Sequence, residues 1–170
     1  MTIREAVQEP NLPLREKASP VKPRDGNFLY LKKLCDDMRD TMRFLDGIGI
    51  AAPQIGEAKK IFLVETALFA DIKIPSDIFI NPKILRHSFK QVSGEEGCLS
   101  VRGLYGTVKR AQTITIEAYD IYGKKFKIKA TGLLARVFQH ETDHLNGILY
   151  IDKAVPSSLH IYTKPEKYEE

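Results

Sequence analysis

The sequence contains only two cysteines, Cys35 and Cys98, among its 170 residues. It therefore lacks the disulfide framework of small secreted domains, and each thiol is expected to be core filler, a ligand or a nucleophile. No apolar run approaches the roughly 20 residues that a membrane helix needs, so no membrane partner is expected. Residues 1–6 show neither the apolar segment of a signal peptide nor an Arg-rich transit peptide. These absences make the cytoplasm the expected location.

A nucleic-acid-binding motif is also lacking, although the net charge is +4 and four lysines lie at positions 124, 125, 127 and 129. Phe126 and Ile128 alternate with these lysines, which is the pattern of a strand with one solvated face. Since no known DNA- or RNA-binding motif accompanies the charge, the pattern favours a solvated strand, and no DNA partner is expected.

Length and composition fit a single domain over residues 1–170, with 43% apolar and 28% charged residues. Residues 1–26 are rich in proline and charge, which predicts an extended N-terminal arm. Residues 156–170 predict a polar tail.

A first helix is predicted from about Asn27, with Asp25 or Asn27 as its cap. Cys35 lies on the apolar stripe of this helix, so we expect a buried structural thiol there. The stripe recurs at spacings of three and four residues: Leu31, Leu34, Cys35, Met38, Met42 and Leu45.

Strands are predicted by alternating or β-branched segments at residues 60–65, 78–85, 89–92, 113–119 and 124–130. A hairpin turn at Asp120–Gly123 joins the last two, whereas Cys98 is expected in a glycine-rich loop. A second helix is predicted from Thr131 or Gly132, with Gly147 as its C-cap. The order predicts an α+β fold in which small antiparallel or mixed sheets pack around a central C-terminal helix.

The second helix carries an H-E-x-x-H motif from His140 through Glu141 to His144. The i, i+4 spacing projects both imidazoles in one direction, close enough to share a metal ion. Glu141 lies one position round and could take a proton from a metal-bound water and pass it to a leaving group. A pair of hydrogen-bonded core histidines is the alternative, but three polar groups on a buried face favour a metal.

The third ligand is not supplied by the patterns of the common metallopeptidases. One pattern requires histidine where Tyr150 stands, and the other requires a glutamate that only the polar tail could provide. Cys98 remains, and a thiolate with two imidazoles leaves one coordination position open, as catalytic sites require. These ligand types by themselves would suggest zinc.

Three segments together resemble the motifs of the peptide deformylase family, in the family's order. They are Gly47–Gln54, Glu96–Ser100 and Gln139–Gly147, and a weaker match around Pro13 extends the resemblance over most of the chain. The resemblance implies removal of the formyl group from the N-terminal formylmethionine of newly made polypeptides. It also implies a bacterial-type setting and a place of action at the ribosome surface. One departure is Arg102, where the family usually has proline.

The resemblance also implies the metal and its chemistry. Cys98, His140 and His144 would hold Fe²⁺, with Zn²⁺, Ni²⁺ or Co²⁺ as substitutes. Glu141 would act as general base and then as acid. The side-chain amide of Gln54 and the backbone N–H of Leu99 would donate hydrogen bonds to the oxyanion.

Substrate contacts and supporting residues follow from the same resemblance. Ile48 and Gly49 would pair with the extended peptide through the backbone, and Val137 would line the methionine pocket. Glu96 and Arg110 would form an ion pair that supports the ligands. Two alternatives remain open: a metallopeptidase that cuts internal bonds, and a deformylase-like domain kept for binding.

Overall fold

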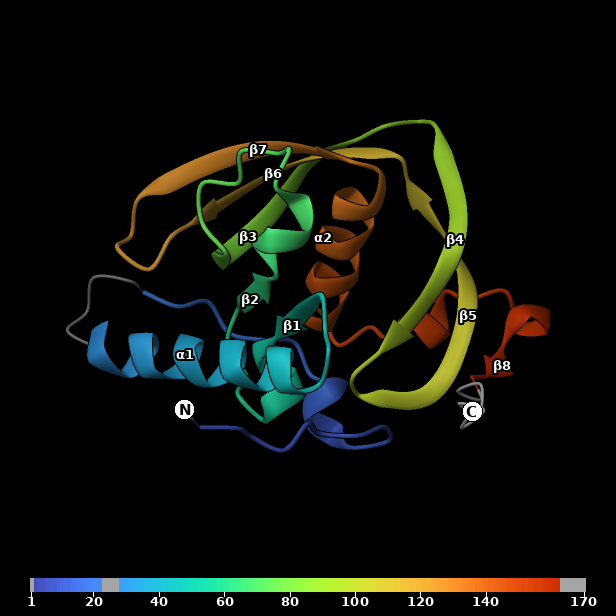
Figure 1. The fold of residues 1–170 in the computed structure, drawn as a ribbon, viewed down its shortest axis with the longest axis horizontal. Coiled ribbons are helices and arrows are strands. Elements are labelled where there is room, and N and C mark those ends of the chain that lie inside the picture. The colour runs from blue at the N-terminus through green and yellow to red at the C-terminus, as the bar shows by residue number, and fades with distance from the viewer. Residues whose placement is uncertain (1, 23–27, 163–170) are drawn as a thin grey trace, which may run out of the picture.

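The computed structural model describes residues 2–22 and 28–162, and its elements are labelled in Figure 1. The described helices are α1 (Phe28–Phe44) and α2 (Gly132–His144). The described strands are β1 (Gly49–Ala51), β2 (Ile61–Val64), β3 (Ile78–His87), β4 (Gln91–Cys98), β5 (Val101–Ala111), β6 (Thr113–Tyr119), β7 (Lys125–Thr131) and β8 (His160–Ile161).

The strands form two sheets on either side of α2. One sheet has the order β1-β2-β3-β6-β7 and the other β4-β5-β8, and all pairings between these strands are antiparallel. In Figure 1 α2 lies between the first sheet and the long β4–β5 hairpin. The predicted α+β fold with a central C-terminal helix is thereby confirmed.

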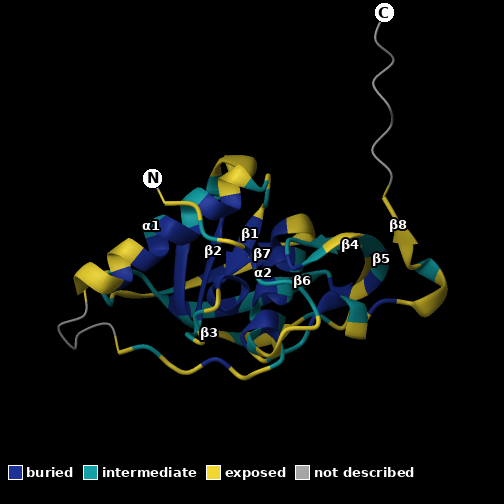
Figure 2. Cartoon of the chain, turned by 90° about the horizontal axis from the view of Figure 1, so that it is seen from below, coloured by how far each residue is buried: buried dark blue, intermediate teal, exposed yellow. Residues whose placement is uncertain are grey.

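The main core lies where α2 meets the inner face of the five-stranded sheet. The ring of Phe79 lies 4.7 Å from that of Phe62 and 4.7 Å from that of Phe138, centroid to centroid. Burying each such ring stabilises the fold by roughly 1.5–3 kcal/mol. Figure 2 shows that buried residues surround α2. The polar side chains of this helix are consequently held away from water.

The first helix covers the other end of this sheet. Its apolar stripe includes Leu34, Met38 and the buried Cys35, and it packs against β1 and β2 through Ile50 and Leu63. The prediction of a buried structural thiol is confirmed. The predicted caps, Asp25 and Asn27, lie outside the described residues. Among the described segments, no helix is long and apolar enough to cross a lipid bilayer.

The segment around Cys98 differs from its predicted loop. Cys98 is the last residue of β4, and the residues from Val101 onward form β5 in antiparallel register with it. A Cβ atom at position 106 would lie 2.8 Å from a methyl group of Leu159, which explains why this residue is glycine. The glycine interrupts the alternation of side chains by which the strand could have been predicted.

The predicted C-cap of α2 is also wrong. The helix ends at His144, Leu145 takes the cap position, and Gly147 adopts a φ of +73° two residues further on. Beyond it, part of the predicted tail is ordered, since β8 pairs with β5 through Leu104 and Ile161.

Candidate metal centre

Three metal-ligating side chains converge between α2 and the end of β4. The Sγ atom of Cys98 lies 3.3 Å from Nε2 of His144, and that nitrogen lies 3.2 Å from Nε2 of His140. All three ligand atoms lie within 4.8 Å of one another. Ligands at 2.0–2.3 Å from a tetrahedral ion lie about 3.3–3.8 Å apart, so this set fits a divalent ion with one position left open.

Glu141 and His144 carry buried atoms that the protein does not satisfy. Among the described residues, Oε2 of Glu141 and Nδ1 of His144 have no hydrogen-bond partner. Burial raises the pKa of Glu141 to about 7, while the charge of His140 opposes this shift. Burial lowers the pKa of His144 well below its usual value, which favours the neutral imidazole that binds metals. His144 therefore offers a neutral imidazole, and Glu141 an unpaired carboxyl oxygen, to a bound group.

Gln54 presents its amide nitrogen to the same centre. Its Oε1 accepts a hydrogen bond from the backbone N–H of Ala51 at 2.8 Å. This bond directs Nε2 toward Sγ of Cys98, 3.4 Å away, and Oγ of Ser100, 3.3 Å away. The amide N–H groups of a buried residue are thus fixed beside the ligand set.

Glu96 orients His140 from behind. Its Oε2 accepts from Nδ1 of His140 at 2.9 Å, which leaves Nε2 of this ring to face the other ligands. Arg110 donates to both carboxylate oxygens, at 2.9 Å and 2.8 Å. Burial alone would raise the pKa of Glu96, but the hydrogen bonds from Arg110 and His140 hold it well below its usual range. The expected ion pair is present and is linked directly to a ligand.

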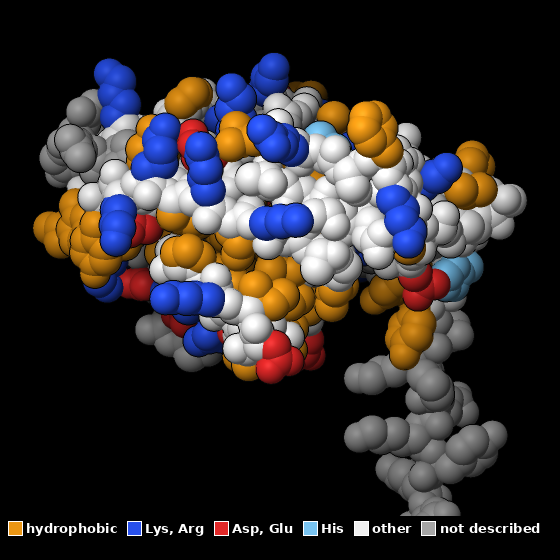
Figure 3. All heavy atoms as spheres, turned by 90° about the horizontal axis from the view of Figure 1, so that it is seen from above, with side chains coloured by type: hydrophobic (Ala, Val, Ile, Leu, Met, Phe, Trp, Pro, Cys, Tyr) orange, Lys and Arg blue, Asp and Glu red, His pale blue; other side chains and the backbone are white. Residues whose placement is uncertain are grey.

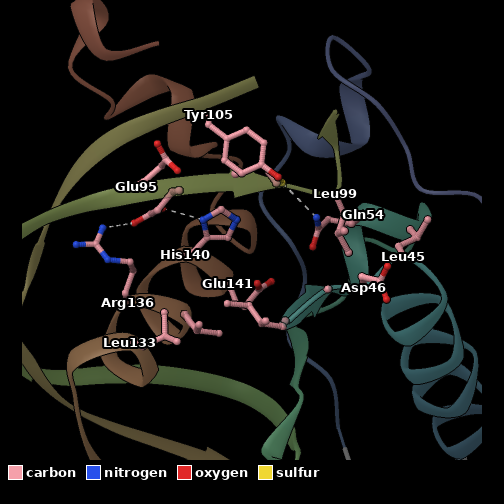
Figure 4. A pocket seen from close by; sticks show the side chains of 17 residues that line it. Leu45, Asp46, Gln54, Glu95, Leu99, Tyr105, Leu133, Arg136, His140 and Glu141 are labelled. Atoms are coloured by element: carbon pink, nitrogen blue, oxygen red, sulfur yellow. Dashed lines mark hydrogen bonds and ion pairs between the residues drawn. The ribbon is translucent and has the colours of Figure 1, made fainter. Parts of the chain in front are cut away.

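Arg136 is a further member of this network that sequence reasoning missed. It donates to Oε1 of Glu96 at 2.7 Å, and to the backbone oxygens of Val92, Gly94 and Val108 at 2.8, 3.2 and 2.9 Å. In Figure 4 Arg136 and His140 approach the same carboxylate from opposite sides. Its position four residues before His140, in the otherwise apolar first half of the helix, was the available signal.

Tyr150 packs against the metal centre. Its ring stacks on that of His140, with centroids 6.1 Å apart and an interplanar angle of 19°. Its hydroxyl donates to the backbone oxygen of Leu104 at 2.7 Å. The residue that ruled out the longer metallopeptidase motif therefore packs against a ligand.

A cavity of about 460 Å³ opens beside these residues (Figure 4). Most of the predicted site residues line it, whereas His144 and Arg110 lie behind its wall. Its lining also includes residues that the sequence analysis did not select: Leu45, Asp46, Glu95, Tyr105, Leu133 and Arg136.

Comparisons with known proteins agree with this geometry. The profile of the family described as "Polypeptide deformylase" matches residues 3–159. A peptide deformylase from Syntrophomonas wolfei is 43% identical over 159 residues, covering 94% of this chain and 98% of that protein. A solved peptide deformylase from Legionella pneumophila is 39% identical with a TM-score of 0.81, covering 92% of this chain and 88% of that one. A Met-Ala-Ser-bound class I type b peptide deformylase from Acinetobacter baumannii is 33% identical with a TM-score of 0.81, covering 89% and 98%.

These likenesses extend over nearly the whole chain, far beyond the helix that carries the two histidines. A bare H-E-x-x-H match would not produce them, because unrelated metallopeptidases share only that short segment. The chain belongs to the peptide deformylase family: it is a metal-dependent hydrolase that removes the N-formyl group from nascent peptides.

Proposed function

We propose that Glu141 is the general base and then the general acid of this deformylase. The observation that carries the proposal is its buried Oε2, which has no partner among the described residues and belongs to the cavity wall beside the ligands. A divalent metal held by Cys98, His140 and His144 supplies Lewis-acid chemistry at the formyl carbonyl. Glu141 takes a proton from the attacking water and delivers it to the leaving amine.

Gln54 and Leu99 are proposed to stabilise the oxyanion. Attack on the formyl carbon places negative charge on its oxygen, and a preorganised donor there contributes about 3 kcal/mol. The support for Gln54 is its fixed amide, whose oxygen is held by Ala51 and whose nitrogen lies near Cys98. The support for Leu99 is its place in the cavity lining directly after that ligand.

The substrate is proposed to lie along β1 in an extended conformation. Among the described strands β1 is at one end of its sheet, so one side of its backbone is open to a further strand. Ile48 and Gly49 would make this pairing, and both line the cavity. Val137 lies in the opposite wall on α2 and would contact the methionine side chain. The tripeptide bound to the Acinetobacter baumannii protein also begins with methionine.

Glu96 and Arg110 are proposed to support the ligands without touching the substrate. Fe²⁺ is proposed as the physiological ion, with Zn²⁺, Ni²⁺ or Co²⁺ as substitutes, and the family resemblance is the support. Residues 1–170 would form one catalytic domain that acts in the cytoplasm, near the ribosome surface where formylated chains emerge.

The test is turnover of formyl-Met-Ala-Ser by protein loaded with Fe²⁺ under anaerobic conditions. Glu141→Gln, which keeps the side chain's shape, should retain the metal and lose turnover by roughly 10²–10⁴-fold. Near wild-type turnover by this variant would contradict the assigned role. Reloading the wild-type protein with Zn²⁺, Ni²⁺ or Co²⁺ compares the ions, and higher turnover with Zn²⁺ than with Fe²⁺ would contradict the choice of iron.

A further inference from the structure

The outer face of the strands β3, β6 and β7 gathers basic side chains that are far apart in the sequence. Side chains along a strand alternate between its two faces, and Ile116 and Ile128 point into the core against α2. The residues that alternate with these isoleucines along β6 and β7, such as Glu117 and Lys127, therefore face outward. The register places them in three rows across the sheet: Tyr119–Lys125, Lys83–Glu117–Lys127 and Arg86–Thr115–Lys129. On β3 the partner of Tyr119 is Ile80, which is buried and does not belong to the outer face.

This lysine face, defined as the residues of these three rows, holds five basic groups and one acid. Glu117 is shared by two of the lysines, at 3.1 Å from Lys125 and 3.3 Å from Lys127. Five minus one is +4, the formal charge of the whole chain, so the other 21 basic and 21 acidic residues balance. The excess positive charge of the protein thus equals that of a single face, and Figure 3 shows many Lys and Arg side chains on the β6–β7 side.

The lysine face is exposed and separate from the catalytic cavity. Its five basic residues are all exposed. No residue of β3, β6 or β7 belongs to the lining of the cavity. A partner bound to this face would therefore leave the route to the metal centre open.

We propose that the lysine face binds the phosphate backbone of double-helical RNA; the choice of RNA over duplex DNA rests on the proposed place of action near the ribosome surface. Strand geometry makes the face about 14 Å long, from Lys125 to Lys129, and about 10 Å across three strands. A nucleic-acid duplex carries one charge per about 1.7 Å with both strands counted, so a length of about 14 Å carries about eight phosphates. Those on the near side would face the five cations. In the sequence only the lysines at positions 124 to 129 stand together, and by themselves they favour a solvated strand. The register adds Lys83 and Arg86 to them.

The composition of the face selects this partner over two others. Binding to single strands relies on aromatic platforms, and the three rows offer only Tyr119, whose ring already lies 5.3 Å from the ammonium group of Lys125. Stable membrane attachment needs inserted apolar groups as well as charge. The three rows expose no aliphatic side chain, and Leu85, in the irregular part of β3 between them, is only 38% exposed. Backbone contacts alone predict binding with little sequence preference.

The experiment measures anisotropy of a labelled 20-base-pair RNA duplex titrated with metal-loaded protein between 50 and 200 mM KCl. The affinity should fall with salt with a log–log slope of about −3 to −4, as expected for a few phosphate contacts. The triple variant Lys83→Gln, Lys127→Gln, Lys129→Gln should bind at least tenfold more weakly, with a slope shallower by about 2 to 3.

The matched control makes the same charge change elsewhere. Lys17→Gln, Lys32→Gln, Lys73→Gln removes three exposed lysines from other segments and should keep wild-type affinity within about threefold. Equal losses in the two triple variants would overturn the proposal, because total charge would then explain the binding. Equal or tighter binding of single-stranded RNA, or of phosphatidylglycerol vesicles in place of the duplex, would also overturn it.

Turnover of free formyl-Met-Ala-Ser separates this inference from the proposed catalytic roles. The lysine-face variant should hydrolyse this peptide at the wild-type rate, since its substitutions lie outside the cavity. If the protein turns over the peptide but does not bind the duplex, only the inference about the lysine face fails. If it binds the duplex but Glu141→Gln keeps its turnover, only the catalytic role fails.

Discussion

Gly49 leaves the space that the Glu141 carboxylate occupies. A Cβ atom at position 49 would lie 2.5 Å from Oε1 of Glu141, closer than such atoms approach in real proteins. The backbone conformation does not demand glycine here, so the neighbouring carboxylate explains the residue. β1 therefore fixes how far the proposed general base can reach toward the substrate strand.

Gly49→Ala should consequently displace Glu141 and impair the reaction without removing the metal. A shift of about 1 Å in a catalytic group can cost roughly 10²-fold, so we expect a loss of that size in kcat/KM. Steady-state kinetics and metal analysis of the same preparation measure the two effects. Unchanged kcat/KM would show that the carboxylate is not confined in this way.

A double-mutant cycle tests the contact itself. Glu141→Asp shortens the side chain and makes room for the added methyl group, so Gly49→Ala should cost less in this background than in the wild type. Additive losses would mean that Gly49 acts through the substrate backbone instead.

Arg136→Met should weaken metal binding. The substitution removes one hydrogen bond from Glu96, which orients His140, and removes the Arg136 donor from three backbone oxygens of β4 and β5. Loss of such an orienting contact typically costs 10- to 100-fold in metal affinity, which competition with a chelator measures. Arg136→Lys should restore part of the loss, since it keeps the charge without the planar fork.

Arg39→Met is the matched control for that variant. Arg39 also links its helix to another segment, through Asp77 at 2.7 Å, and pairs with Asp36 within α1 at 2.8 Å, but it does not line the catalytic cavity. It should lower the unfolding temperature while metal affinity stays unchanged. If Arg136→Met binds the metal as tightly as the wild type, Arg136 does not support the ligands and only stabilises the fold.

The two cysteines should differ in their reaction with iodoacetamide. Burial raises the pKa of Cys35 to about 12, so its thiol stays protonated and unreactive when the pH is raised from 7 to 9. Cys98 should be protected in metal-loaded protein and modified after chelation, because its Sγ belongs to the ligand set. Peptide mass spectrometry identifies the modified residue, and labelling of Cys35 in the folded protein would contradict its burial.

The regular elements could be predicted where burial gives a simple period. The stripe that contains Cys35 marked α1, and the alternation around Ile116 marked β6. β5 escaped prediction because Gly103 and Gly106 break the alternation, although the strand continues through both. This segment is extended because it pairs with β4 on one side and with β8 on the other, and the local sequence pattern carries no sign of these pairings.

The ligands were accessible to sequence reasoning because a helix fixes the geometry of His140 and His144. Arg136 was not, since its partners are Glu96 and backbone oxygens of β4 and β5, which lie about 30 to 40 residues away in the sequence. The packing of Tyr150 on His140 was equally hidden. Contacts that depend on tertiary proximity rather than spacing along one element leave little trace in a single sequence.

The cross-links of α2 have a consequence for the exchange of ions. Arg136, Gln139 and Asp143 follow one side of the helix at spacings of three and four and bond to β4, to Ala111 and to Arg110. The helix and the hairpin are thereby joined at three levels by the protein alone. Removal of the metal should therefore abolish the reaction while the protein stays folded. A zinc finger, by contrast, unfolds without its metal. Different ions can consequently bind, one after another, to the same preformed site.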